Sequence, residues 1–323
     1  MPRFVIHHIT KYNYPEPVRD SANQVMLFPL KDERQEVQSF KLKITGNPAI
    51  EIFKDYYENE YGSFMYVFPH TELKIETTLA VVTKPVTLPA ATADIAGEWH
   101  HLEEIKNIVP FIDFLKQEQF DALAEVKQIE DADKYKAGPV FAAVTELNEY
   151  VYQHFQYIKG ITSVETTVNE IWKLKAGVCQ DFAHMLLVML RLLCIPARYV
   201  SGYVCPHDQQ LRGEGATHAW VEAYIPFYGW LGLDPTNNCV VSDLHVRLAV
   251  GRNFSDVSPV KGTYKGTAQQ TLEVGVSVSH EDGLESAQMA TILKPQPITI
   301  NKENGEMESN SYRRYQQMMQ QQQ

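Results

Sequence analysis

Hydrophobic and polar residues alternate through the N-terminal part of the chain. Two runs show this most clearly, the first at Phe40, Leu42 and Ile44 and the second at Leu73, Ile75, Leu79 and Val81. A period of two is typical of strands that bury one face and expose the other. Turn-forming residues separate the runs at 46–48, 59–62 and 69. We therefore predict a small all-β sandwich domain of antiparallel strands over residues 1–88.

A helical period replaces the alternation after a segment at 84–97 that is rich in proline and alanine and predicts a linker. Helical patterns follow at 102–128, with an interruption at Pro110, and at 140–157. The second pattern carries an apolar stripe of Phe141, Val144, Leu147, Val151 and Phe155. This spacing is that of a helix face buried in a core, which we favour over a ligand-binding surface.

The segment 180–193 is apolar on nearly all sides, which predicts a helix buried by its surroundings. Strand patterns follow at 197–204, 218–225 and 231–234. Within 218–225, small apolar residues alternate with His218 and other aromatic or polar residues, so we expect the small apolar face to pack on the helix or the core. Helices first and antiparallel strands afterwards indicate an α+β domain, which we place at 98–290.

The C-terminal residues divide into one strand pattern and a polar tail. Leu272, Val274, Val276 and Val278 alternate with polar or small residues and predict a closing strand. From 295 to 323 the composition shifts to Asn, Glu, Ser, Met and Gln, and the chain ends in glutamines. We expect this segment to be disordered, because it offers little apolar surface to bury.

The candidate chemistry begins with Cys179, which lies where a loop turns into the apolar helix. A thiol at a helix start is close to unpaired backbone N–H groups and to the positive end of the helix dipole, and both favour the thiolate. His218 and Asp234 follow inside strand patterns. A cysteine that attacks a carbonyl needs a base, and the base needs a third group that fixes its tautomer. We predict Cys179, His218 and Asp234 as a catalytic triad.

The segments around these residues resemble the transglutaminase-like superfamily of papain-type thiol enzymes. The resemblance covers about 160–265 and is carried by five ordered blocks: Gly177–Ala183, Ile195–Tyr203, His218–Glu222 with Gly229–Trp230, Asp234–Asn237, and Gly251–Asn253 with Asp256–Gly262. It is closest to the bacterial branch whose members are named as cysteine proteases. A fainter similarity at Tyr12–Tyr14, Pro17–Val18 and Ser21–Asn23 resembles the N-terminal domain of that branch. The resemblance implies a papain-like, transglutaminase-core fold with the nucleophile at the start of a central helix.

Other assignments of these residues stay open. His184 and His207 are alternative bases, although their positions on the helix and in a loop suit the role less well. Asp181, in the first helical turn, fits a structural role better than a catalytic one. The N–H of Cys179 is a natural oxyanion donor, whereas the sequence does not identify a second donor. Cys205 and His207 would be two zinc ligands, but no further paired Cys or His motif supports a metal site.

Charge and composition exclude several functions. Lys and Arg number 29 against 40 Asp and Glu, so the formal net charge of −11 and the lack of long basic clusters argue against a nucleic-acid partner. No apolar run approaches a bilayer span, and the N-terminus lacks a secretory pattern. We therefore expect a cytoplasmic protein with no membrane partner and with four free thiols. We expect no cofactor and no metal, and the sequence does not indicate the oligomeric state.

The leading hypothesis is a thiol-dependent hydrolase of amide bonds, a cysteine peptidase whose partner is a protein or peptide substrate. A protein-glutamine transamidase or deamidase would use the same triad, because the first step is identical. Hydrolysis is favoured because the sequence shows no calcium loop of the EF-hand type and lacks the large extra domains of animal transglutaminases. A non-catalytic binding module is the third alternative, and the intact set of three residues argues against it.

Overall fold

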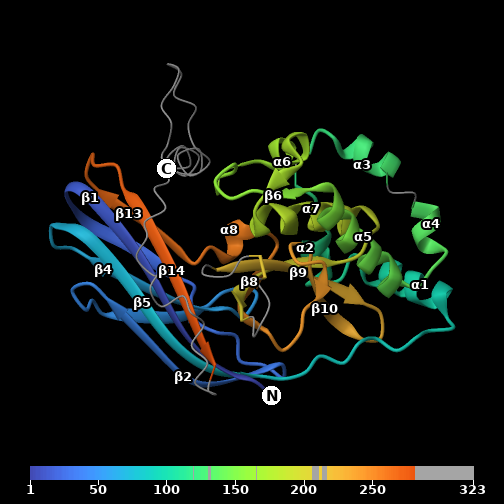
Figure 1. Cartoon of the computed structure of the whole chain (residues 1–323), viewed down its shortest axis with the longest axis horizontal. Coiled ribbons are helices and arrows are strands. Elements are labelled where there is room, and N and C mark those ends of the chain that lie inside the picture. The colour runs from blue at the N-terminus through green and yellow to red at the C-terminus, as the bar shows by residue number, and fades with distance from the viewer. Residues whose placement is uncertain (119, 130–131, 165, 206–210, 213–216, 281–323) are drawn as a thin grey trace.

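One long strand organises the N-terminal half of the fold. The computed structural model describes residues 1–118, 120–129, 132–164, 166–205, 211–212 and 217–280. In it β1 (Arg3–Val25) pairs with β5 (His70–Thr83) along its first part and with β4 (Glu60–Tyr66) along its last part. The outer strands β2 (Gln35–Ile44) and β3 (Ile50–Lys54) complete the antiparallel order β2-β5-β1-β4-β3. These strands form the curved β layer on the left of Figure 1, as the alternation predicts.

The two C-terminal strands also belong to this layer. The alternating segment at 272–278 forms β14 (Thr271–His280), as predicted, but its partner is β1, with Phe4 opposite His280 and Asn13 opposite Thr271. The strand before it, β13 (Val260–Lys265), pairs with the far end of β1. The prediction that 98–290 forms one separate domain is therefore wrong for these strands, because alternation shows which face is buried and not which strand is the neighbour. The tail at 295–323 lies outside the described residues.

Helices form the layer on the right of Figure 1. The predicted helix at 102–128 is three helices, α1 (Ile95–Ile105), α2 (Phe111–Leu115) and α3 (Leu123–Ile129). The first begins inside the predicted linker because Asp94 caps it, accepting the N–H of Gly97 at 2.9 Å. Then come α4 (Ala132–Lys136), α5 (Val140–His154), α6 (Val168–Leu174) and α7 (Cys179–Leu192), with a short α8 (Phe254–Val257) later in the chain. The predicted stripe of α5 is buried except for the half-buried Phe141.

A five-stranded antiparallel sheet in the order β11-β10-β9-β8-β12 supports these helices. Its members are β8 (Ala197–Val204), β9 (His218–Ile225), β10 (Gly229–Asp234), β11 (Cys239–Val240) and β12 (His245–Gly251). The bounds of β8 and β9 are those predicted, whereas β12 was not predicted. A parallel pair of short strands, β6 (Gln156–Tyr157) and β7 (Ala176–Gly177), leads into α7. The α+β class is confirmed.

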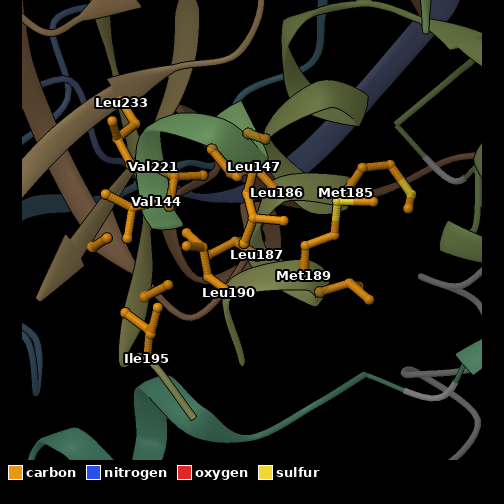
Figure 2. Close-up of a cluster of buried hydrophobic side chains, with 14 of the residues drawn as sticks. Val144, Leu147, Met185, Leu186, Leu187, Met189, Leu190, Ile195, Val221 and Leu233 are labelled. Atoms are coloured by element: carbon orange, nitrogen blue, oxygen red, sulfur yellow. The ribbon is translucent and has the colours of Figure 1, made fainter. Parts of the chain in front are cut away.

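The helix α7 packs on one face of this sheet. Its Leu186 and Leu190 lie in one cluster with Val221 of β9 and Leu233 of β10, together with Val144 and Leu147 of α5 (Figure 2). Ala219 and Ala223 of β9 belong to the same core, so the small apolar face of β9 meets the helix as predicted. This packing holds the start of α7 close to the start of β9.

The opposite face of the sheet packs against the N-terminal β layer. Tyr203 and Cys205 from the end of β8 and Val246 and Leu248 from β12 lie in the same hydrophobic core as Phe4 of β1. The two layers therefore share buried apolar surface, which couples the N-terminal strands to the five-stranded sheet. None of the helices in the described ranges is both long and apolar enough to cross a bilayer.

A buried ionic cluster also links the layers. Glu222 of β9 is fully buried and binds Arg198 of β8 at 2.6 Å, Arg247 of β12 at 3.2 Å and Arg34 of the N-terminal segment at 3.4 Å. Burial alone would raise the pKa of Glu222, but the three arginines outweigh it and lower the pKa to about 2. The carboxylate is thus held ionised between two strands of the sheet and the N-terminal layer.

Replacing Glu222 with glutamine is expected to destabilise the fold by about 3 kcal/mol, because the buried Arg247 and the partly buried Arg198 and Arg34 lose a shared counter-charge. Urea denaturation at pH 7 measures the loss. Because the folded pKa is lowered, the wild-type contribution is complete above the ordinary glutamate pKa and disappears as the pH falls through about 2. Glu60→Gln, which removes an exposed pair with Lys31, is the control and should cost under about 1 kcal/mol. Equal losses in both variants would contradict a special role of the Glu222 cluster.

Candidate active site

Cys179 is the first residue of α7, which begins shortly after the two-residue strand β7. Asp181 holds this junction, because its Oδ2 accepts the N–H of Val178 at 2.7 Å and the hydroxyl of Thr162 at 2.6 Å. A side chain at Gly177 would place its Cβ 2.3 Å from the same oxygen, so the close approach requires glycine. Burial raises the pKa of Asp181, against these two hydrogen bonds. The contacts fit the structural role expected for Asp181.

The first turn of α7 presents backbone N–H groups next to the thiol. Asp181 and Phe182 donate their N–H groups to the Val178 carbonyl at 2.9 and 3.1 Å. The N–H groups of Cys179 and Gln180 stand before the first carbonyl that a helix can offer, so they have no partner within α7. They are therefore the groups of this turn that are suited to receive a developing oxyanion.

His218 and Asp234 meet because β9 and β10 form an antiparallel hairpin. Leu233 lies opposite Val221, so the next pair sets Asp234 opposite Trp220, on the face of β9 that carries His218. The Nε2 atom of His218 is 2.8 Å from Oδ2 of Asp234, and both side chains are fully buried. Strand register thus brings together two residues that lie sixteen positions apart.

The second ring nitrogen of His218 faces the cysteine. Its Nδ1 is buried and has no hydrogen-bond partner within the described residues. Besides Asp234, Cys179 is the group that acts on the protonation of the His218 ring. Burial lowers the pKa of His218, but the charge and hydrogen bond of Asp234, helped by Cys179, outweigh it and raise the pKa to about 10. At neutral pH the ring of His218 is therefore the charged imidazolium.

Asp234 is held by a larger set of donors than the sequence indicated. Its Oδ1 accepts the backbone N–H groups of Thr236 at 2.9 Å and Asn237 at 3.2 Å, in a turn typical of aspartate. Its Oδ2 accepts the Asn237 amide at 2.7 Å and lies 3.4 Å from Nε2 of His245. Burial would raise the pKa of Asp234, but His218 and His245 outweigh it and hold the pKa far below its usual range.

His245 and Asn237 were not predicted as site residues. Asn237 stands three residues after Asp234, where an Asx turn could have suggested it. His245 comes from β12, eleven positions after Asp234, and no local pattern marks it.

The ligand atoms of His218, Asp234 and His245 lie within 4.8 Å of one another, a spacing that a metal ion could use. All three groups already satisfy one another by hydrogen bonds, and the same carboxylate oxygen also accepts the Asn237 amide. A metal would have to displace these protons in a fully buried site. The donor set therefore fits a hydrogen-bonded network better than a metal centre, and the absence of a metal stays a prediction.

Of the remaining candidates, Cys239 lies opposite Asp234 on β11, whereas Cys205 belongs to the core shared with the N-terminal β layer. Burial raises the pKa of Cys205, and burial followed by the charge of Asp234 raises that of Cys239 to about 12. His184 is partly buried and its Nε2 accepts the N–H of Phe254 at 3.2 Å. His207, the other alternative base and zinc ligand, lies outside the described residues. Of the two candidate bases in the described part of the chain, His218 interacts with Cys179 and His184 does not.

Comparison with known proteins gives two matches to family descriptions. Residues 127–235, which contain all three predicted triad positions, match the transglutaminase-like superfamily. Residues 4–82 match the bacterial transglutaminase-like N-terminal region. The first region runs from α3 to the end of β10, and the second runs from β1 to β5.

Individual relatives agree with these matches. An uncharacterised protein of Mycobacterium leprae is 31% identical over 289 residues, which cover 86% of this chain and 99% of the relative. A crystal structure from Cytophaga hutchinsonii, described as that of a proposed cysteine protease, has a TM-score of 0.68 at 25% identity and covers 87% of this chain and 91% of that one. A protein-glutamine gamma-glutamyltransferase of Pseudomonas aeruginosa is 29% identical over 110 residues, 31% of this chain and 16% of that protein.

Proposed function

The chain belongs to the transglutaminase-like superfamily, and we propose that it is a thiol-dependent hydrolase of amide bonds, a cysteine peptidase acting on protein or peptide substrates. Members of this superfamily are generally enzymes. The observation that carries the proposal is the buried contact of 2.8 Å between His218 and Asp234, which leaves the other nitrogen of the ring for Cys179. The name of the Cytophaga hutchinsonii relative supports the same class of reaction.

The reaction begins when the sulfur of Cys179 bonds to the carbonyl carbon of the substrate. Negative charge develops on the carbonyl oxygen, and the N–H groups of Cys179 and Gln180 at the start of α7 stabilise it. The imidazolium of His218 gives its proton to the amide nitrogen, the carbon–nitrogen bond breaks, and the amine leaves. The product of this half-reaction is a thioester on Cys179 and a neutral His218.

Water completes the cycle. His218, now neutral, takes a proton from the water that adds to the thioester carbonyl, and the carbon–sulfur bond then breaks. The carboxylic acid leaves, and the thiolate and imidazolium are restored. Asp234 stays ionised throughout, keeps the Nε2 nitrogen protonated and stabilises the charged ring.

A glutamine transamidase or deamidase is the second candidate. The similarity to the Pseudomonas aeruginosa protein-glutamine gamma-glutamyltransferase favours it, although that similarity covers 16% of the relative's length. The thioester forms in the same way, with a glutamine side chain as the acyl donor. A deamidase thus differs from a peptidase in the amide that is attacked, and a transamidase differs further in that an amine, not water, attacks the thioester.

An assay with both acceptors separates these functions. The chain is incubated with casein in the presence of the fluorescent amine dansylcadaverine, and new N-termini, free ammonia and incorporated amine are measured. We expect new N-termini without incorporated amine, and neither product with the Cys179→Ala variant. Incorporated amine that requires Cys179 would identify a transamidase, and ammonia alone a deamidase. A wild-type protein that matches the alanine variant in all three products and in peptide-library cleavage would point to a non-catalytic module.

A further inference from the structure

His245 is a buried histidine that contacts the same oxygen of Asp234 as His218 does. It is the first residue of β12, and its side chain is 2% exposed. Its Nδ1 accepts the backbone N–H of Ser242 at 3.3 Å, so the ring hydrogen of the neutral form must lie on Nε2. That nitrogen is 3.4 Å from Oδ2 of Asp234. His245 is therefore oriented as a hydrogen-bond donor to the carboxylate that also binds His218.

Trp220 fixes the plane of the His245 ring. The two rings meet edge to face, with centroids 5.3 Å apart and an interplanar angle of 76°. Trp220 is itself fully buried, and its indole packs so closely over Gly202 that a Cβ there would lie 2.4 Å from the ring. The hydrogen bond from Ser242 and the contact with Trp220 together fix the orientation of the His245 ring toward Asp234.

Side chains of the N-terminal β layer hold the backbone on both sides of His245. Thr83, the last residue of β5, donates its hydroxyl to the carbonyl of Asp243 at 2.5 Å. Gln35, the first residue of β2, accepts the N–H of Arg247 and donates to its carbonyl, both at 2.8 Å. Residues 243 and 247 are thus tied to a layer that contributes nothing directly to Cys179, His218 or Asp234.

We propose that His245 is a positioning residue for Asp234, and that the N-terminal β layer acts on the active site by holding His245 in place. The inference rests on the proposed function, because it assigns a role in orienting the triad. It gives the N-terminal layer a purpose beyond covering the sheet, because Thr83 and Gln35 hold the backbone on both sides of His245 in addition to the pairing of His245 with Val204 of β8.

Loss of the hydrogen bond from His245 should change the pH dependence of Cys179 alkylation. The titratable groups that face Asp234 are His218 from β9, His245 from β12 and Cys239 from β11, with Cys179 of α7 beyond His218. The His245 hydrogen bond is one of the contacts that lower the pKa of Asp234. Without it the carboxylate is no longer held by His245 and can turn away from Nε2 of His218, so it stabilises the imidazolium less well, and the acid limb of Cys179 alkylation moves to higher pH.

The test compares His245→Gln, which keeps a donor near the position of Nε2, with His245→Met, which has similar bulk and no donor. The rate of Cys179 alkylation by iodoacetamide is measured from pH 4 to 10. The constants kcat and KM are measured with a peptide that the wild-type protein cleaves. We expect His245→Met to lower kcat about ten-fold with little change in KM, and to move the acid limb of alkylation to higher pH. His245→Gln should stay within about three-fold of the wild type. Equal loss in the two variants, or no loss in His245→Met, would overturn the proposal.

A second pair of variants tests whether the N-terminal layer acts through His245. This pair also tests the proposal if His245→Met does not fold. Thr83→Val removes the hydroxyl that donates a hydrogen bond to the carbonyl of Asp243. The control, Thr77→Val, removes a buried hydroxyl of the same strand, β5, whose hydrogen-bond partner is Tyr203. Only Thr83→Val should move the acid limb of alkylation. Identical profiles for both variants would refute the link. If His218→Ala has the same pH profile of Cys179 alkylation as the wild type, the proposed function fails. The failure of the proposed function can therefore be told apart from the failure of the role given to His245.

Discussion

Replacing Cys179 with alanine is expected to abolish turnover, with a loss of about 10⁴-fold or more in kcat/KM, while the fold stays intact. The sulfur is the atom that bonds to the substrate, and no other described group stands at the position that His218 faces. Cys179 is only partly buried, so the smaller side chain leaves little cavity. Peptide hydrolysis measures the activity, and thermal unfolding of the same sample shows whether the fold is retained. A folded and fully active alanine variant would contradict the mechanism.

The same assignment predicts the order in which the thiols react. All four cysteines are free, but Cys194, Cys205 and Cys239 lack a histidine partner of the kind that Cys179 has in the described structure. Iodoacetamide followed by peptide mass mapping should therefore label Cys179 far faster than the others. Equal labelling of the four thiols in the native protein would remove the support for Cys179 as the nucleophile.

Changing Asp234 to asparagine is expected to lower kcat by about 10⁴-fold, the size of the effect in a comparable triad, while the thiol stays reactive. The amide has the shape of the carboxylate but cannot stabilise the imidazolium. In the wild type the raised pKa of His218 means that its charged form is stabilised fully below about pH 6.5 and loses this support as the pH rises through about 10. In the variant the alkaline limb of Cys179 alkylation should move toward neutral pH.

Two further variants make this result specific. His218→Ala should slow both alkylation near neutral pH and turnover, because it removes the proton carrier itself. Asp256→Asn removes a partly buried carboxylate that pairs with Arg252 outside the triad, and it should leave the alkylation profile unchanged. If His218→Ala has the wild-type profile, His218 is not the partner of Cys179.

Much of the candidate site could be predicted because its signals are local. The bounds of β8 and β9 follow from alternation within eight residues each, and the burial of α7 follows from its apolar composition on nearly all sides. The position of Cys179 at a helix start depends on the few residues around it. The class of fold and the three residues proposed as a triad were accessible for this reason, and the family resemblance added the order in which they occur.

The structure alone decided the contacts that join distant segments. Alternation identified β14 but not its pairing with β1, and the apolar pattern at 102–128 did not show that the chain breaks into three helices. The Arg34 contact with Glu222 and the Thr83 contact with the turn before His245 join residues 188 and 160 positions apart. A single sequence records how hydrophobic each position is, and hence which face is buried. It does not record which buried face meets which, because that choice is made by packing the whole chain at once, and the contact of His245 with Asp234 follows from that packing.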